Sequence, residues 1–443
     1  MKTIGFFLRN NNLTDVDFSR PQEGNPGIGG REYMNSLISY SISHFCIDNY
    51  KVNLYSQAKV NTPKIQSLTI VETLEGAISR ASDDKVDYFV LDVSISNSNV
   101  LSFIDAARNY KVKIIVRLGL LPNYQILCML AESDWVVAVV CVEREVYEVI
   151  KDHEVSSKSL IMQNPIAIDS YVQGPVPIFD RDLSVVYMGS LVPQKGFQRL
   201  ARVWGDVLDK VPNAKLIVLG SGTLYGRDNK LGRWGVASES FEEVIRPHLS
   251  DKEGNLDKSV CFLGNLGKEK NIYLSKATVG IANPTGTTET FCLAAIEIQA
   301  NYTPVIAGKI GGLFDTVSDQ YTGYLIDSDE ELKDKIIFLL KNKQKAYQMG
   351  INGREYVEHR YHFKKVAHRW ASLFDSLNNG VVSPKDDYYK YGRSIYSKLS
   401  TYNRLFKKTI GFWKYWPSTM AIYYFVSKFV MTPLRKLKKV FVR

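Results

Sequence analysis

Two carboxylates, Glu289 and Glu297, stand eight positions apart in a segment that predicts one helix, with Glu289 at its mouth and Glu297 on its body. Buried strands are expected before this helix, at 278–282, and after it, at 304–307. A helix that begins where a strand ends presents backbone N–H groups and a positive dipole end, which can bind an anion. A carboxylate at the same place is then free to bind hydroxyl groups.

The two carboxylates are expected to serve different parts of one ligand. Glu297 lies about two helical turns beyond Glu289, so it can reach a second hydroxylated group. A phosphate with a polyol on each side describes a nucleotide sugar. The alternative is a helix with one capping glutamate and one exposed glutamate, which implies no ligand.

The segment resembles the Glu-x7-Glu signature of glycosyltransferase family 4, whose members are retaining enzymes with the GT-B fold. The positions that match the signature and its continuation are Glu289, Phe291, Leu293, Glu297, 304–307, Gly311, Gly312 and 322–325. The resemblance covers about residues 1–377, is strongest at 185–326, and places Cys292 where the family has glycine. It implies that Glu289 binds donor-sugar hydroxyls and that Glu297 binds the ribose. Backbone N–H groups at Phe291, Cys292 and Leu293 are then expected to contact phosphate.

A second segment, 189–196, follows the predicted strand 185–188 and resembles the family's Gly-Arg-Leu-x3-Lys-Gly. The resemblance implies that Lys195 neutralises the leaving diphosphate and, with Glu289, forms the catalytic pair. The family's arginine is Ser190 here, which replaces a bidentate phosphate contact by a hydroxyl donor. Ser190 is kept as a donor-binding residue, and Arg227 or Lys230 is a candidate for the missing charge.

Two glycine-containing loops are further candidates for donor binding. The loop 24–30 opens a helix after the first strand, and the equivalent family loop contacts donor phosphate and acceptor, which implies this role for Gly29 and Gly30. The loop 264–267 resembles the one that lies against the nucleotide base, which implicates Asn265. A plain turn is the alternative in both places.

Asp92 and Arg117 are the weaker, acceptor-side candidates. Both lie at the ends of predicted strands, 88–91 and 113–117, and therefore at one edge of a parallel sheet. A structural salt bridge is the alternative for Arg117. Many family members have a histidine in this region, but this sequence has none there, so no catalytic role is transferred.

Neither a metal nor a cofactor is predicted, and the nucleotide sugar is expected as co-substrate. The six histidines have no metal-ligand spacing, and no Asp-x-Asp motif stands in a suitable loop. The five cysteines form no Cys-x-x-Cys pair, which is typical of reduced thiols in a cytosolic protein.

The 443 residues alternate apolar strands with helices twice, which predicts an α/β protein with two Rossmann-like, doubly wound domains facing across a cleft. With the resemblance, this is the GT-B architecture, followed by a helical extension. The predicted parts are an acceptor domain at 1–172, a donor domain at 173–360, a crossover helix at 361–384 and a tail at 385–443. A proline-rich linker at 174–178 joins the two domains.

The tail contains fourteen Lys and Arg residues and two acids, a net charge of +12 against +10 for the whole chain. Its aromatic and aliphatic residues recur at helical spacing, at Tyr388, Tyr391, Ile395, Leu399, Tyr402 and Phe406. Basic and aromatic side chains on one helix favour an anionic membrane surface. The alternatives are a partner-binding helix and a homodimer. Nucleic acid is not expected, because no known binding module accompanies the charge.

We therefore expect a retaining, metal-independent hexosyltransferase, peripheral to the cytoplasmic face of the inner membrane. It would move a hexose from a nucleotide sugar, a UDP-hexose, to a lipid-linked glycan in surface polysaccharide (O-antigen or capsule) biosynthesis. The competing hypothesis is a catalytically impaired GT-B protein that acts as a scaffold or partner subunit, because Ser190 replaces arginine and the histidine is missing. A sugar phosphorylase or nucleotide-sugar epimerase is a third class.

Overall fold

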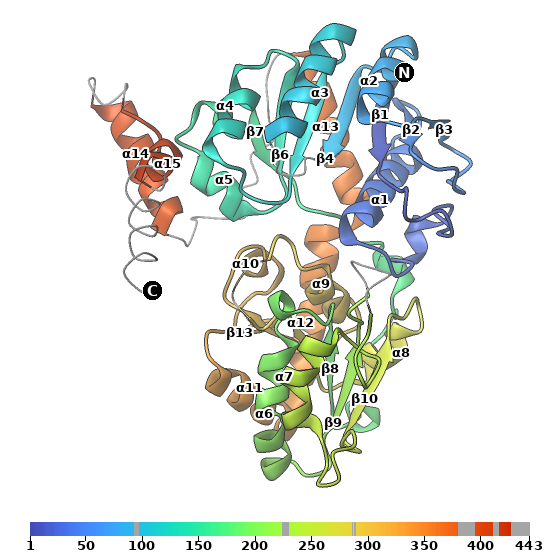
Figure 1. Ribbon diagram of the computed structural model, residues 1–443, viewed down its shortest axis with the longest axis vertical. Helices are drawn as coiled ribbons and strands as arrows, with labels where there is room; N and C mark the ends of the chain where they lie inside the picture. The colour runs from blue at the N-terminus through green and yellow to red at the C-terminus, as the bar shows by residue number, and fades with distance from the viewer. Residues whose placement is uncertain are drawn as a thin grey trace.

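Two parallel β-sheets, one in each half of the chain, form the body of the protein (Figure 1). The computed structural model describes residues 1–92, 97–223, 230–285, 287, 289–379, 395–410 and 416–426. Arg227, Tyr388 and Tyr391, which the sequence singled out, lie outside these ranges. Within them, no helix is both long enough and apolar enough to cross a lipid bilayer.

The first sheet has seven strands in the order β3-β2-β1-β4-β5-β6-β7, all parallel. The strands are β1 (Lys2–Leu8), β2 (Tyr50–Ser56), β3 (Ser67–Ile70), β4 (Tyr88–Asp92), β5 (Ile114–Leu118), β6 (Val136–Cys141) and β7 (Ser159–Ile161). The helices are α1 (Gly30–Phe45), α2 (Leu74–Asp83), α3 (Asn97–Tyr110), α4 (Tyr124–Glu132) and α5 (Arg144–Ile150). Alternate side chains of β1 enter separate apolar cores, with Phe6 in the core under α1 and Phe7 in the core under α2 to α5. The sheet is therefore covered on both faces.

The second sheet has six parallel strands in the order β10-β9-β8-β11-β12-β13. They are β8 (Ser184–Met188), β9 (Lys215–Leu219), β10 (Val260–Gly264), β11 (Val279–Ala282), β12 (Val305–Gly308) and β13 (Gly323–Ile326). Its helices are α6 (Phe197–Lys210), α7 (Glu239–Leu249), α8 (Lys270–Lys276), α9 (Leu293–Ala300), α10 (Leu313–Thr316), α11 (Asp329–Lys341) and α12 (Lys343–Tyr361). Parallel strands with intervening helices are the doubly wound arrangement that the sequence predicted.

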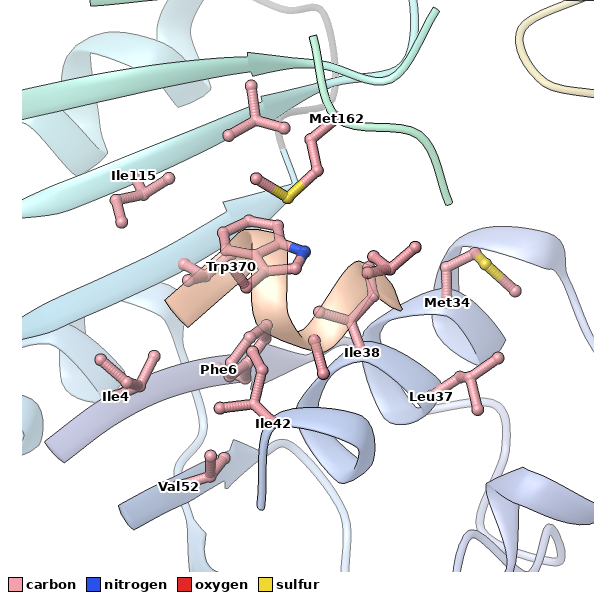
Figure 2. Packing of buried hydrophobic residues seen from close by; sticks show 14 of the residues in the cluster. Ile4, Phe6, Met34, Leu37, Ile38, Ile42, Val52, Ile115, Met162 and Trp370 are labelled. Carbon is pink, nitrogen blue, oxygen red and sulfur yellow. The ribbon is translucent and has the colours of Figure 1, made fainter. Parts of the chain in front are cut away.

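Helix α13 (Phe363–Asn378) carries the chain back to the first sheet. Its apolar residues recur every three or four positions, so they form one stripe. Trp370 in this stripe is 1% exposed and meets Phe6 of β1 edge-on, with 6.5 Å between ring centres (Figure 2). The Tyr50 hydroxyl also donates a hydrogen bond of 2.5 Å to Asp375. The first core is therefore completed by a helix from the far end of the chain.

The described part of the tail forms two short helices, α14 (Ile395–Thr409) and α15 (Thr419–Val426), which lie beside α4 and α5 (Figure 1). Met420 is 4% exposed and joins the core under α4 and α5. The buried side chains of α14 are Ser397, Ser400 and Asn403. The aromatic and aliphatic residues that the sequence placed on one face, Ile395, Leu399, Tyr402 and Phe406, point away from the body and are exposed.

Candidate active site

A hollow of about 500 Å³ lies between the two domains, at the carboxyl ends of strands from both sheets. Twelve of the candidate site residues from the sequence line it: Gly29, Gly30, Asp92, Arg117, Ser190, Lys195, Asn265, Glu289, Phe291, Cys292, Leu293 and Glu297. The topology explains this gathering, because the loops that follow parallel strands emerge at one edge of each sheet. The tertiary structure thus brings the predicted residues together, whereas their roles depend on individual contacts.

Glu289 is held at the wall of the hollow by two side-chain donors. Its Oε2 accepts hydrogen bonds from Lys195 Nζ at 2.8 Å and from Asn283 Nδ2 at 2.7 Å. The Glu289 side chain is 6% exposed and that of Lys195 is 25% exposed. The ion pair therefore faces the hollow mainly through its lysine.

The backbone around Lys195 is fixed by one tyrosine and one glycine. The buried Tyr187 hydroxyl contacts the carbonyls of Lys195 at 2.9 Å and Ser190 at 3.3 Å. Gly196 has φ = +77°, and a Cβ there would lie 2.4 Å from Thr285 Cγ2 and 2.8 Å from Thr285 N. A side chain at position 196 would thus push the lysine loop away from the loop that leads to Glu289.

The pair Gly311–Gly312 supports Glu289 from the other side. Gly312 N–H donates a hydrogen bond of 3.1 Å to the Glu289 carbonyl. A Cβ at Gly311 would come within 2.1 Å of that oxygen, and a Cβ at Gly312 within 1.9 Å of the Thr290 carbonyl oxygen. The close backbone approach explains why two glycines follow β12 in this sequence.

Helix α9 begins at Leu293, so Glu289 lies in the loop before it and not at the mouth that the sequence predicted. The intervening residue Cys292 has φ = +47°, a left-handed conformation that glycine adopts most easily. Because of this strained turn, the helix begins later in the sequence than predicted. Phe291, Cys292 and Leu293 still line the hollow, where the positive end of α9 can attract an anion.

Glu297 is more deeply buried than Glu289, at 1% exposure. Its Oε1 accepts hydrogen bonds from the Tyr171 hydroxyl at 2.9 Å and from Lys270 Nζ at 3.0 Å. Burial, followed by the nearby Glu297 charge, raises the pKa of Tyr171 well above its ordinary value. The carboxylate that was predicted to bind ribose therefore already has two protein donors, although it also lines the hollow.

The structure adds Lys270 and Tyr171 to the candidate site. Lys270 opens the short helix α8, and its side chain is 7% exposed. In the sequence it is one lysine among several basic and acidic residues after the loop 264–267, which is the pattern of a solvated turn. No local signal could therefore have selected it, because its burial depends on Glu297.

Ser190 does not replace the positive charge of the family's arginine. It is 2% exposed, and its hydroxyl donates a hydrogen bond of 3.2 Å to the Ser221 carbonyl. Lys230, the other candidate for compensation, is exposed and does not line the hollow. Among the residues that the structure describes, the basic side chains that line the hollow are Arg31, Arg117, Lys195 and Lys270.

Arg117 and Asp92 form a salt bridge at the N-terminal side of the hollow, with 2.9 Å between Nη1 and Oδ2. Arg117 is 3% exposed and also donates to Asn35 at 3.0 Å and to Asn164 at 2.5 Å. Burial raises the pKa of Asp92, and the neighbouring arginine opposes this shift. The arginine therefore has three partners within the first domain.

Glu143 is a buried acid that the sequence did not single out. It precedes α5 and is 6% exposed. A Cβ added at Gly311 would lie 3.2 Å from its Oε2 atom. Burial first, and then the charges of Asp315, Glu145 and Glu289, raise the pKa of Glu143 to about 9. A protonated carboxyl of the first domain thus faces the glycine pair that supports Glu289.

Asp315 extends this acidic contact between the domains. Its Oδ2 accepts a hydrogen bond of 2.8 Å from the Arg144 backbone N–H, and burial raises its pKa to about 6. Among the described residues, no group of three or more His, Cys, Asp and Glu side chains is arranged to hold a metal ion.

Two doubly wound domains with a polar hollow at their strand ends define the GT-B class of proteins, as the sequence predicted. Solved structures confirm this fold. A structure of Anabaena Alr3699/HepE "in complex with UDP-glucose" aligns with a TM-score of 0.62 and 15% identity, over 85% of this chain and 100% of that one. At this identity the likeness concerns the fold.

Residues 173–356, which form the second domain, match the family model "Glycosyl transferases group 1". A D-inositol 3-phosphate glycosyltransferase from Corynebacterium efficiens is 29% identical over 197 residues, which are 44% of this chain and 41% of that protein. The capsular polysaccharide biosynthesis glycosyltransferase CapM from Staphylococcus aureus is 25% identical over 195 residues, 43% of this chain and 45% of CapM. The matches thus span less than half of these relatives.

Proposed function

We propose that the protein is a retaining glycosyltransferase that moves a hexose from a nucleotide sugar, a UDP-hexose, to a lipid-linked glycan. The observation that carries the proposal is the Lys195–Glu289 pair, which lies in the hollow beside the N-terminus of α9. A cation, a carboxylate and the N-terminus of a helix at one place suit a diphosphate joined to a sugar.

Donor binding would exchange the partners of this ion pair. Lys195 Nζ would leave Glu289 for the diphosphate, where a fixed charge stabilises the leaving group as the bond to the sugar breaks. Glu289 would then accept hydrogen bonds from the sugar hydroxyls. Because Lys195 and the N-terminus of α9 supply positive charge, this step needs no divalent cation.

Retention would follow from attack on the same face of the sugar as the leaving group. The bond between the anomeric carbon and the phosphate oxygen breaks, and a bond from that carbon to the acceptor oxygen forms. The acceptor hydroxyl gives its proton to the leaving diphosphate. No protein nucleophile is required, and the positioned ion pair supplies the electrostatic stabilisation.

The choice of donor and acceptor draws support from the relatives. A GT-B protein of known structure was solved with UDP-glucose, and CapM is named for capsular polysaccharide biosynthesis. On this basis we assign the base to the loop with Asn265 and the ribose to the surroundings of Glu297. The acceptor would enter along Gly29, Gly30 and the Asp92–Arg117 salt bridge, and surface polysaccharide would be the product.

A second candidate is a GT-B protein that binds no donor and acts as a scaffold or partner subunit. The observation in its favour is Ser190, which stands in the place of an arginine and uses its hydroxyl on Ser221. Thermal melting with millimolar UDP or GDP separates the two candidates. A scaffold shows no shift of its melting temperature with either nucleotide.

The proposed reaction is tested with Glu289→Gln, which keeps the shape of the side chain and removes its charge. We expect the rates of sugar transfer and of slow donor hydrolysis to fall by about 100-fold or more. Both rates are measured as the release of UDP from a panel of UDP-hexoses. Glu355→Gln, at an exposed position on α12 of the same domain, is the matched control and should retain full activity. Normal turnover by Glu289→Gln would contradict the site assignment.

A further inference from the structure

Helix α14 is attached to the first domain through its polar face, whereas α15 is attached through hydrogen bonds and through the apolar side chain of Met420. Asp152, which follows α5, is 6% exposed and lies at the centre of this contact. Its carboxylate accepts hydrogen bonds from the Ser400 hydroxyl at 2.9 Å, from Asn403 Nδ2 at 2.7 Å, and from the Thr419 backbone N–H at 2.7 Å. Lys407 Nζ also donates to the Asp152 carbonyl at 3.0 Å. One buried aspartate therefore joins both α14 and α15 to the body.

This attachment turns the apolar side of α14 outward. Residues three or four positions apart share one side of a helix, so burial of Ser397, Ser400 and Asn403 exposes the opposite side. On that side Leu399 is 50% exposed and Tyr402 is 60% exposed. We call the exposed apolar surface of α14 the outer tail face, which consists of Ile395, Leu399, Tyr402 and Leu405.

The charges around the outer tail face have one sign. The described tail segments, 395–410 and 416–426, contain no Asp or Glu. Of their basic residues, Lys407 is bound to the body through the Asp152 carbonyl, and the others are Lys398, Arg404 and Lys408. Aromatic and aliphatic side chains flanked by cations suit the interface of an anionic lipid bilayer. A second copy of this chain fits less well, because two tails that each carry +12 over 385–443 would repel each other.

We propose that the outer tail face binds an anionic lipid surface, and that Asp152 fixes this lipid-binding surface rigidly to the first domain. The lipid contact and the protein contact use opposite sides of α14, so both exist at the same time. Lipid binding needs no catalytic activity and goes beyond the proposed function. Membrane binding would also hold a lipid-linked acceptor near the first domain, and this consequence rests on the proposed transferase function.

Lipid binding is tested with the full chain and the variant Leu399→Ser/Tyr402→Ser/Leu405→Ser, whose positions are all exposed. We expect the unaltered protein to sediment with phosphatidylcholine vesicles that contain phosphatidylglycerol and to bind pure phosphatidylcholine vesicles at least about tenfold more weakly. The variant should bind the anionic vesicles at least about tenfold more weakly than the unaltered protein. Equal binding by variant and unaltered protein would overturn the proposal.

The matched control is Ile47→Ser/Ile70→Ser/Phe179→Ser, which removes three exposed apolar side chains from the body. It should bind anionic vesicles as the unaltered protein does, and an equal loss would show that lipid binding is not specific to the tail. Light scattering without vesicles should give a monomer. A dimer that the tail variant converts to a monomer would identify the outer tail face as a contact between copies and overturn the proposal.

The role of Asp152 is tested separately with Asp152→Ala. This variant should expose Arg404 and Lys407 to limited trypsin digestion at least about tenfold faster, because α14 loses its hydrogen-bonded attachment. Its binding to anionic vesicles should stay within about threefold of the unaltered protein, because lipid contacts the other side of the helix. Unchanged protection from trypsin would contradict the attachment. Donor hydrolysis in solution should be unaffected by the tail variants, so failure of the lipid proposal is distinguishable from failure of the proposed transferase activity.

Discussion

Two ion pairs of the same residue types border the hollow, yet their surroundings differ. Lys195–Glu289 and Lys270–Glu297 have N–O distances of 2.8 and 3.0 Å. The lysine of the first pair is 25% exposed, whereas the lysine of the second is 7% exposed and its glutamate also binds Tyr171. The first pair is open enough for a ligand to replace one partner, as the proposed function requires, whereas the second pair is nearly buried. The two glutamates of one sequence motif therefore form ion pairs that differ in their exposure.

The same contrast has an energetic side. A partly exposed ion pair contributes little to stability, because water screens it and can replace either partner. A buried pair is costly to break from one side, because the remaining charge has no compensation. We thus expect substitutions at the first pair to change activity and those at the second pair to change stability.

The largest expected effect is on activity, from Lys195→Met. Removing the cation that stabilises the leaving diphosphate should lower kcat/KM for a UDP-hexose by about 100- to 1000-fold. The unfolding midpoint in urea should stay close to that of the unaltered protein. Lys210→Met, at an exposed position on α6, is the control and should change neither quantity. A large loss of stability with Lys195→Met would remove the contrast between the two pairs.

The next effect is on stability, from Glu297→Gln. The amide keeps an oxygen for Tyr171 but leaves Lys270 buried without its counter-charge, which should cost about 3 kcal/mol of unfolding free energy. Adding Lys270→Met to this variant should recover all but about 1 kcal/mol, because it removes the uncompensated charge. Urea unfolding of the two single variants and the double variant measures this coupling. Strictly additive losses of unfolding free energy would show that Glu297 and Lys270 do not stabilise each other.

A smaller effect concerns pH and the contact between the domains. The pKa of Glu143 is raised to about 9, whereas an unfolded glutamate has a pKa of about 4.3. Between these values the folded protein holds a proton that the unfolded chain has released. The stability contributed by this group is thus fully present below about pH 4 and is lost as pH rises towards about 9.

Glu143→Gln removes this titration and keeps a neutral group against Gly311. Its unfolding free energy should fall less between pH 5 and pH 9 than that of the unaltered protein, because the variant has no carboxyl to titrate at this position. Urea unfolding at pH 5, 7 and 9 checks the difference. Parallel pH profiles for the two proteins would show that Glu143 does not carry its proton in the folded state.

The smallest effect is expected from Cys292→Gly, which restores the family's residue at the turn before α9. Glycine relieves the left-handed conformation by about 1 kcal/mol but loses the packing of a buried thiol, which is of similar size. Unfolding free energy and turnover should therefore both stay close to those of the unaltered protein. Cys292→Ala loses the sulfur and keeps the strain, so it should be less stable than Cys292→Gly by about 1 kcal/mol.

The sequence predicted most of the fold because short apolar strands and intervening helices leave strong local patterns. Strand β7 was missed, since three residues are too few for an alternation to be recognised. Strand β13 was noticed only as part of a motif, and α9 begins later than predicted because Cys292 turns the backbone before it. These differences concern local geometry, and the order of elements is unaffected.

The sequence could predict which residues lie in the candidate site, but it could not predict the contacts that they make. Residues after parallel strands must meet at one sheet edge, so the motif positions at Ser190, Asn265 and Glu289 could be grouped from the chain alone. The partners of Glu297 could not be predicted. Tyr171 and Lys270 lie 126 and 27 positions away from it, and only the packing of the domains brings them together.

The tail marks the limit of what the sequence by itself determined. Helical periodicity established that α14 has an apolar side and a polar side, because this follows from 3.6 residues per turn. It could not decide which side packs on the body, and the usual expectation is the apolar one. Only the tertiary structure decided, since Asp152 at the end of α5 offers a buried carboxylate that the polar side satisfies with hydrogen bonds. An unsatisfied buried charge would be costly, so the apolar side is left facing outward.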